Sequence, residues 1–391
     1  MNKFDIIHNN YQHKFVKENP KMLNHLFGTT DVMPLWIADM DFKIASEITE
    51  ELHRLVNRGI YAYEFDSKSV FNSITSWNKN RHNLELNSRA FIQVTGVLTG
   101  ISLLIRELTK EEDGILIQTP VYHQFEQIIK TANRKVVKNP LKIVNGNYEM
   151  DFEDLEEKLK TKSVQIIILC NPHNPVGRVW NKQEINQLIH LADKHGVTII
   201  SDEIHSDIIY GTTQFNSIAS FDQTKHITVL GSPAKTFGMQ SISNGYLYIQ
   251  DETIFKQIKH IAEAMYLNHG NAFTTFATIA AYTKGETWVN ELIAYLEETL
   301  DWITQFMKKD LPQIKWFSPQ GTYQIWMDFS ELQLTNDQLN ELLFKKAKLG
   351  LTPGGWFGKE FLQFMRMNIA SPKAKIQQAF QQLKEVINEN L

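Results

Sequence analysis

The chain has 391 residues, of which 42% are hydrophobic, and a formal net charge of −4 from 44 acidic and 40 basic residues. This length has room for one large α/β domain with a substantial core and a smaller second domain. The near balance of charges excludes the strongly basic surface that would bind nucleic acid or an anionic membrane. Small molecules are therefore the expected partners.

Cysteine content and hydropathy bear on the cellular compartment. The single cysteine, Cys170, excludes an intramolecular disulfide and fits a reducing compartment. The N-terminal residues lack a hydrophobic signal segment, and the longest apolar runs, such as residues 164–170, are too short to span a bilayer. These features predict a cytoplasmic protein, and no bound metal is expected.

The middle of the chain alternates between strand and helix patterns. Residues 164–169 form a nearly continuous apolar run rich in β-branched side chains, which is typical of a strand buried on both faces. Apolar residues then recur at helical spacing from Ile185 to Ala192, and Gly196 is a stop signal. Further strands are predicted at 197–200, 227–230 and 245–249. Strand, helix and strand of these lengths imply a right-handed crossover in a mostly parallel sheet flanked by helices.

A smaller α+β domain is predicted toward the C-terminus. A long helical pattern runs from Trp288 to Leu311 and ends before Pro312, which would break it. Beyond it the pattern predicts a strand, a helix, a strand and a closing helix, at 324–329, 339–348, 364–369 and 376–387. We assign residues 46–287 to the large domain, and residues 1–45 and 288–391 to the small one. The first forty or so residues lack a clear period and are expected to pack across both domains or against a neighbouring subunit.

Three polar motifs directly follow three of the predicted buried strands. They read Asn171-Pro172-His173-Asn174-Pro175-Val176-Gly177, Ser201-Asp202-Glu203-Ile204-His205 and Gly231-Ser232-Pro233-Ala234-Lys235-Thr236. Ligands of open parallel sheets lie beyond the carboxyl ends of the strands, so Asn174, Asp202 and Lys235 are expected to converge. A site for pyridoxal 5′-phosphate (PLP) needs these groups: an amine for the aldehyde, a carboxylate for the pyridine nitrogen and a donor to the phenolate oxygen. The carboxylate keeps the ring protonated and therefore an electron sink.

These motifs resemble those of the class I and II aminotransferase superfamily of PLP enzymes, and all three occur in the family order. The resemblance covers nearly the whole chain. It implies the PLP-dependent transferase fold type I, with a large domain around a mostly parallel sheet and a smaller α+β domain. The segment Trp36-Ile37-Ala38-Asp39-Met40-Asp41-Phe42 is similar to the MalY and PatB group of cystathionine and cysteine-conjugate β-lyases. Further matches to that group lie at 119–122, 320–323 and 366–370.

The resemblance implies roles for the residues nearest the reacting atoms. Lys235 would form the Schiff base with the cofactor and then remove the Cα proton of the substrate. Asp202 would pair with the pyridine nitrogen, and Asn174 would donate to the phenolate oxygen, with His205 nearby. Arg366 would clamp the substrate α-carboxylate, since a guanidinium fork matches that planar group.

The remaining matches concern the cofactor ring and phosphate. Tyr122 would stack on the ring. Ser232 and the backbone amides of Val97 and Leu98, at the start of a predicted helix, would hold the phosphate. Tyr63 resembles a tyrosine that reaches the phosphate from the other subunit, which implies a homodimer with shared active sites.

Structural roles remain open for some of these side chains, and the chain departs from the family at two places. His205 is also explained by a structural hydrogen bond, Tyr122 by core packing and Tyr63 by an aromatic cluster with its neighbours. Many aminotransferases carry a phosphate-binding arginine where this chain has Ser243, so phosphate binding is expected to be weaker or differently supplied. The approach to Arg366, residues 357–364, lacks the glycine-rich character of many relatives, so the substrate pocket is expected to differ.

The fold type does not determine the reaction. The resemblance of residues 36–42 and the absent arginine favour a carbon-sulfur β-lyase, which cleaves cystathionine or another S-substituted cysteine to a thiol, pyruvate and ammonia. The alternative enzyme is an aminotransferase acting on an aromatic or aliphatic amino acid. A regulatory protein with a PLP-fold sensor is the alternative of another class, although no basic DNA-binding segment precedes the fold.

Overall fold

The computed structural model describes residues 2–8, 15–221, 226–267 and 269–390. Its larger sheet has seven strands among these residues, and in spatial order they are β2 (Phe91–Val94), β10 (Gly245–Ile249), β9 (Ile227–Gly231), β8 (Thr198–Asp202), β7 (Val164–Cys170), β3 (Gly114–Thr119) and β4 (Lys135–Pro140). Strands β9, β8, β7, β3 and β4 run parallel, whereas β10 is antiparallel to both of its neighbours. The predicted mostly parallel sheet is confirmed.

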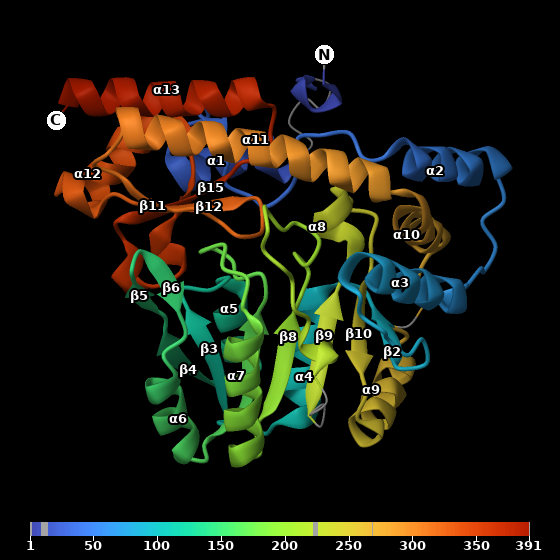
Figure 1. Ribbon diagram of the computed structural model, residues 1–391. Helices are drawn as coiled ribbons and strands as arrows, with labels where there is room; N and C mark the ends of the chain where they lie inside the picture. The colour runs from blue at the N-terminus through green and yellow to red at the C-terminus, as the bar shows by residue number, and fades with distance from the viewer. Residues whose placement is uncertain (1, 9–14, 222–225, 268, 391) are drawn as a thin grey trace.

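Helices cover both faces of this sheet (Figure 1). Alternate residues of β7 belong to different cores: Ile167 and Leu169 join the core of α7, whereas Ile166 and Ile168 join the core of α4. This alternation explains the continuous apolar run, because both faces of the strand exclude water. The helices of the first face include α6 (Phe152–Lys160) and α7 (Lys182–His195), and those of the second face are α4 (Val97–Leu108), α5 (Gln124–Thr131) and α9 (Glu252–Ala264).

Helix α7 ends at the predicted stop signal, and a capping box that was not predicted marks its start. Asn181 and Glu184 form a reciprocal capping box at its N-terminus. Gly196 follows its last residue with a left-handed φ of 68°, a conformation that favours glycine. The chain can therefore reverse directly into β8, which delivers Asp202 to the end of the sheet.

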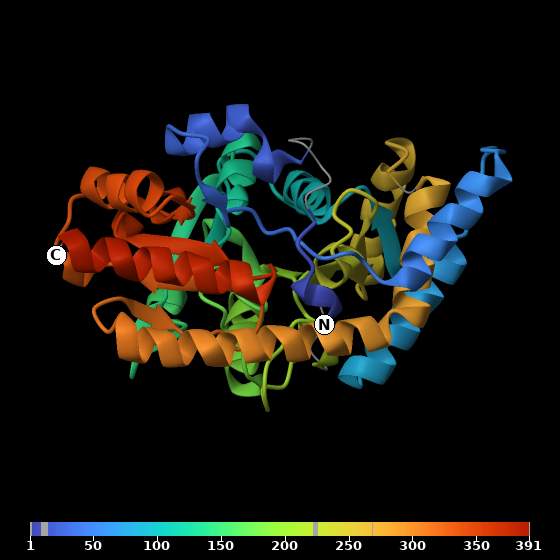
Figure 2. The same ribbon diagram turned by 90° about the horizontal axis from the view of Figure 1, so that it is seen from above.

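A second, four-stranded sheet lies above the first in Figure 1. It is antiparallel, in the order β11 (Lys315–Phe317), β12 (Gln324–Asp328), β15 (Phe364–Asn368) and β14 (Thr352–Pro353). The long helix α11 (Glu286–Asp310) and the closing helix α13 (Lys373–Asn390) lie side by side over it (Figure 2). Trp302 and Phe380 join these helices, with ring centroids 5.9 Å apart. The helix expected at 339–348 consists of α12 (Asn336–Asn340) and a π-helical stretch, Glu341–Lys346.

The N-terminal region connects the two sheets. Helix α1 (Pro20–Phe27) is followed by β1 (Met33–Pro34), which pairs in parallel with β13 (Leu349–Gly350). The next residues, 35–42, run between the sheets and contact side chains from both. The division of the chain into 46–287 and the two flanking ranges remains a proposal, supported by the separate sheets.

The remaining helices and strands complete the described chain. They are α2 (Ser46–Arg58), α3 (Ser67–His82), α8 (Pro233–Phe237) and α10 (Ala272–Lys284), with the hairpin β5 (Lys142–Val144) and β6 (Asn147–Glu149). Short helical turns lie at Lys3–Asp5, Val16–Glu18, Ile218–Ser220, Ser330–Leu332, Gly354–Trp356 and Lys359–Phe361. Within the described ranges, no helix has the length and apolar character required to cross a membrane.

Candidate active site

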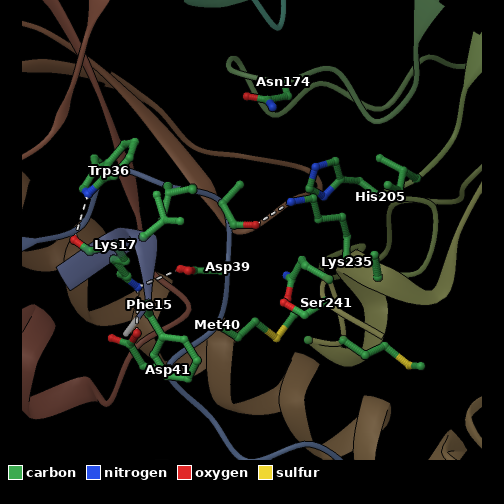
Figure 3. Close-up of a pocket in the computed structure, with 18 of the residues that line it drawn as sticks. Phe15, Lys17, Trp36, Asp39, Met40, Asp41, Asn174, His205, Lys235 and Ser241 are labelled. Carbon is green, nitrogen blue, oxygen red and sulfur yellow. Dashed lines mark hydrogen bonds and ion pairs between the residues drawn. The ribbon is translucent and has the colours of Figure 1, made fainter. Parts of the chain in front are cut away.

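A cavity of about 1240 Å³ opens at the carboxyl ends of the central strands (Figure 3). Asn174 follows β7, Asp202 ends β8, and Lys235 lies in α8 directly after β9. All three side chains line this cavity. Because the strands run parallel, three segments that are separate in sequence deliver their polar residues to the same edge.

Asp202 carries a buried carboxylate. Its side chain is 5% exposed, and Oδ1 accepts a hydrogen bond from the Ile204 amide at 3.1 Å. Burial raises the pKa of Asp202 to about 6, against the opposing effects of that amide and of Lys235. The charged form of such a buried carboxylate is stabilised by a cationic partner in the cavity.

Lys235 is held by its own short helix. Ser232 caps α8, and Nζ of Lys235 donates to the carbonyl oxygen of Ala38 at 2.5 Å. Burial lowers the pKa of Lys235 to about 8, and the positive charge of Arg366 acts in the same direction. An amine with this pKa is neutral in a useful fraction near pH 7, which suits both nucleophilic attack and proton abstraction.

Arg366 enters the same cavity from β15 of the smaller sheet. It is 3% exposed, and its guanidinium donates to the side chain of Asn174 and to the carbonyl oxygen of Trp36, each at 3.0 Å. Phe357 lies against the guanidinium, with its ring centroid 5.4 Å from Cζ. The Nε atom is buried without a hydrogen-bond partner among the described residues. A buried, incompletely paired guanidinium is suited to a planar anion such as a carboxylate.

His205 and Tyr122 are both brought to the cavity, in different environments. His205 is almost fully buried and lies edge-on to Tyr323, with ring centroids 5.5 Å apart. Burial, and then the charges of Lys235 and Arg366, hold the pKa of His205 well below its usual range. His205 is therefore a neutral group beside Lys235. Tyr122 is half-buried and lines the cavity, so its ring is available to stack on a planar ligand.

The start of α4 provides backbone groups suited to an anion at one end of the cavity. Gly96 precedes the helix without a side-chain cap, and Gly96, Val97 and Leu98 line the cavity. Four backbone amides at a helix start lack intrahelical acceptors, and the helix dipole favours an anion there. A Cβ on Gly245 would lie 2.8 Å from the carbonyl carbon of Gly96, so only glycine permits this close approach.

Two of the predicted cofactor contacts have other surroundings within the chain. The hydroxyl of Ser232 donates to the Asn244 carbonyl oxygen at 2.8 Å and accepts from the Ala234 amide at 3.2 Å. Tyr63 is 97% exposed and does not line the cavity of its own chain. None of residues 357–364, the approach to Arg366, lines the cavity, whereas Trp356 immediately before them does.

Sequence reasoning did not assign a role to a group of charges on one wall of the cavity (Figure 3). Lys17 is 3% exposed and forms ion pairs with Asp39 at 3.1 Å and Asp41 at 2.7 Å. Lys375 also pairs with Asp41, at 2.8 Å. Both aspartates belong to the segment 36–42, whose resemblance to one group of enzymes was the available signal. Nothing local marks Lys17 as a buried lysine.

The residues present fit pyridoxal phosphate. Lys235 offers an amine, Asp202 a buried carboxylate and Tyr122 a ring, while the uncapped start of α4 offers amides for a phosphate. These groups line one cavity, and together they match a ligand with an aldehyde, a basic ring and a phosphate.

Comparison with known proteins gives concordant results. The family model for aminotransferase class I and II matches residues 30–383. Cystathionine beta-lyase PatB of Bacillus subtilis is 37% identical, over 93% of this chain and 94% of its own, and protein MalY of Escherichia coli is 29% identical, over 90% of each. The solved structure of the PLP-bound C-S lyase from Staphylococcus hominis matches with a TM-score of 0.90 at 27% identity, covering 98% of this chain and 97% of its own.

Proposed function

Because the chain belongs to the aminotransferase class I and II family, in its MalY and PatB group, we propose that it is a PLP-dependent carbon-sulfur β-lyase. It cleaves cystathionine or other S-substituted cysteines by α,β-elimination. With one water molecule, the substrate yields a thiol, pyruvate and ammonium. A relative named for cystathionine cleavage, similar over nearly the full length of both chains, supports this assignment.

The observation that carries the proposal is the meeting of Lys235, Asp202 and Arg366 on one cavity. Lys235 would hold the aldehyde of the cofactor, Asp202 its pyridine nitrogen and Asn174 its phenolate oxygen, beside His205. Bound PLP supplies an electron sink for the charge that develops when the substrate Cα loses its proton.

The cofactor ring and phosphate would be held by a second set of residues. Tyr122 would stack on the ring, as its place on the cavity wall permits. The amides of Val97 and Leu98 would bind the phosphate at the start of α4. Ser232 would contribute its hydroxyl only by exchanging its present bond to the Asn244 carbonyl. No arginine stands at Ser243, so the backbone amides would provide most of the binding.

The chain's own groups account for substrate binding and proton transfer. Arg366 binds the α-carboxylate and thereby orients the Cα–H bond. Nζ of Lys235 accepts the Cα proton, and its lowered pKa of about 8 leaves a neutral fraction available at pH 7. His205 remains neutral under these conditions, since its pKa is held far below 7, so it adds no positive charge that would compete with that proton.

A homodimer with shared active sites is part of the proposal. Aromatic side chains between α2 and α3 lie exposed on the single chain, including Tyr61 at 58%, Tyr63 at 97% and Phe65 at 52%. Tyr266 and Met265, which follow α9, are also exposed, at 69% and 59%. Exposed apolar groups of this size mark interaction surfaces. Tyr63 would then reach the phosphate of the partner subunit.

We also propose that the protein is cytoplasmic. Its partners would be small amino-acid thioethers, and it would bind neither nucleic acid nor a membrane. The single cysteine supports a reducing compartment, and the small net charge of −4 supports the absence of polyanionic partners. Cys170 is buried, and burial raises the pKa of its thiol, so this residue does not offer a reactive thiolate.

A single assay tests the reaction. PLP-loaded protein is incubated with L-cystathionine or S-ethyl-L-cysteine without any 2-oxo acid, and free thiol and pyruvate are measured together. We expect the two products in equal amounts, and their loss in the Lys235→Ala variant. Formation of pyridoxamine phosphate without thiol release would instead identify an aminotransferase, and the β-lyase assignment would be wrong.

A further inference from the structure

One carboxylate of the charged wall, that of Asp39, is more exposed than the charged side chains around it. Asp39 has 31% of its side chain exposed, whereas Lys17 has 3%. Oδ1 of Asp39 is buried, so the exposed area belongs to the rest of the side chain. Asp39 lines the cavity and lies on the segment between Lys17 and Lys235 (Figure 3).

The lysines around Asp39 are more closely engaged by Asp41. Asp41 pairs with Lys17 at 2.7 Å and Lys375 at 2.8 Å, while Lys17 approaches Asp39 at 3.1 Å. Burial raises the pKa of Asp41, but these two lysines outweigh burial and hold that pKa below its usual range. By contrast, burial outweighs Lys17 at Asp39 and raises its pKa. A further cation at Asp39 would therefore be stabilised by a charge that the protein leaves only partly compensated.

The segment that carries Asp39 also bonds with both groups that would fix a substrate. The carbonyl oxygen of Trp36 accepts from Arg366, and that of Ala38 accepts from Lys235. An extended chain covers about 3.3–3.6 Å per residue, so the three steps from Trp36 to Asp39 span at most roughly 10 Å. An amino acid with its α-carboxylate at Arg366 and its Cα at Lys235 would therefore lie beside this segment.

We propose that Asp39 binds a cationic group on the sulfur substituent of the substrate, such as the distal ammonium of cystathionine. This inference rests on the proposed β-lyase function and specifies the substrate class of that site. The acceptor is the carboxylate of Asp39, which the ion pair with Lys17 at 3.1 Å holds in place.

Apolar side chains of the same cavity would accommodate substrates without a cation. Met40, Met239 and Ile242 line the same cavity. Methionine is flexible and polarisable, so such a surface adapts to alkyl groups of different shape. Asp39 therefore decides preference among substituents and does not decide whether elimination takes place.

A pair of matched substrates isolates the interaction. L-cystathionine and S-(3-carboxypropyl)-L-cysteine differ only in the distal ammonium, and S-ethyl-L-cysteine lacks the whole distal group. On the wild-type holoenzyme we expect kcat/KM to be about tenfold or more higher for cystathionine than for the carboxypropyl analogue, as for a lost charge-assisted hydrogen bond. The Asp39→Asn variant should reduce this ratio to within about twofold of unity, and turnover of S-ethylcysteine should change by less than about twofold.

Glu18→Gln is the matched control, because Glu18 is another acidic residue lining the cavity. We expect it to retain the wild-type ratio, which excludes a general effect of negative charge. Equal loss on all three substrates in Asp39→Asn would overturn the proposal, since Asp39 would then act through Lys235. An unchanged ratio would also overturn it, as would a wild-type enzyme that does not distinguish the two matched substrates.

Binding provides a readout that does not depend on elimination. The same three amino acids are titrated into the holoenzyme, and the dissociation constant is taken from the absorbance of the cofactor. If no thiol is released from any of them, the β-lyase function fails, whereas the inference about Asp39 still predicts tighter binding of cystathionine. Equal dissociation constants for cystathionine and its carboxypropyl analogue would overturn the inference alone. The wild-type comparison also stands if Asp39→Asn does not fold.

Discussion

The guanidinium of Arg366 donates a hydrogen bond to Oδ1 of Asn174 across 3.0 Å, although 192 residues separate them. Arg366 belongs to the smaller sheet, and Asn174 belongs to the loop that follows β7 of the larger one. The same guanidinium donates to the backbone of Trp36, in the segment between the sheets. The candidate site therefore depends on how the two sheets and the N-terminal region pack together.

Replacing Arg366 by lysine tests this arrangement. An ammonium group has three donors and no planar fork, so it cannot bind a substrate carboxylate through two parallel hydrogen bonds while also donating to Asn174 and Trp36. We expect Arg366→Lys to raise KM for cystathionine by about tenfold or more, with a smaller effect on kcat. Steady-state kinetics measures this, with cofactor content as the control. A loss confined to kcat would contradict a role in carboxylate binding.

The charge of Asp202 can be removed with little change in shape. Asp202→Asn keeps the size of the side chain but removes the ion pair that would hold the pyridine nitrogen protonated. We expect kcat to fall on the order of a hundredfold or more, comparable with the loss of other preorganised electrostatic groups. KM should change little. Kinetics at saturating PLP separates this effect from cofactor loss, and full activity would exclude the assigned role.

Lys235 makes the free energy of unfolding of the cofactor-free protein vary with pH in the alkaline range. Its pKa is lowered by burial from 10.5 to about 8, so the folded state binds the proton less well than the unfolded state does. The resulting destabilisation is fully present below pH 8 and is relieved as pH rises from 8 to 10.5. At 1.36 kcal/mol per pKa unit it amounts to about 3 kcal/mol.

Urea unfolding of the wild type and of Lys235→Met over that pH range measures this dependence. The variant carries no titrating group at this position, so its stability relative to the wild type should fall by about 3 kcal/mol with rising pH. Groups that are not electrostatically coupled to Lys235 titrate equally in both proteins and cancel. A constant difference between the two curves would show that burial does not lower the pKa of Lys235.

Shared active sites in a homodimer are tested by mixing two inactive variants. Tyr63→Ala damages the site of the partner, whereas Lys235→Ala damages the site of its own chain. A mixed dimer then contains one site with both changes and one with neither. We expect activity to return when the subunits are exchanged, to roughly one quarter of the wild-type level for random pairing of equal amounts. No recovery in verified mixed dimers would place Tyr63 outside the shared site.

Several elements of the fold are predictable from local pattern. Residues 164–169 have apolar side chains on both faces, and the structure buries them between two helical layers. The pattern does not encode the direction of a strand. Residues 245–249 are also largely buried, yet β10 runs antiparallel to its neighbours. The spacing of apolar residues also does not reveal the π-helical turn at Glu341–Lys346, since helical periodicity alone does not distinguish it from an α-helix.

The sequence by itself determined the family, the parallel core and the meeting of Asn174, Asp202 and Lys235, because motifs after parallel strands must reach the same edge. Only the tertiary structure decided which distant charges meet there. Lys17 lies in a region without a clear period, and its burial is explained only by Asp39 and Asp41 beside it. Periodicity reports which side of an element is apolar, whereas an ion pair depends on the separation of charges that sequence distance does not specify.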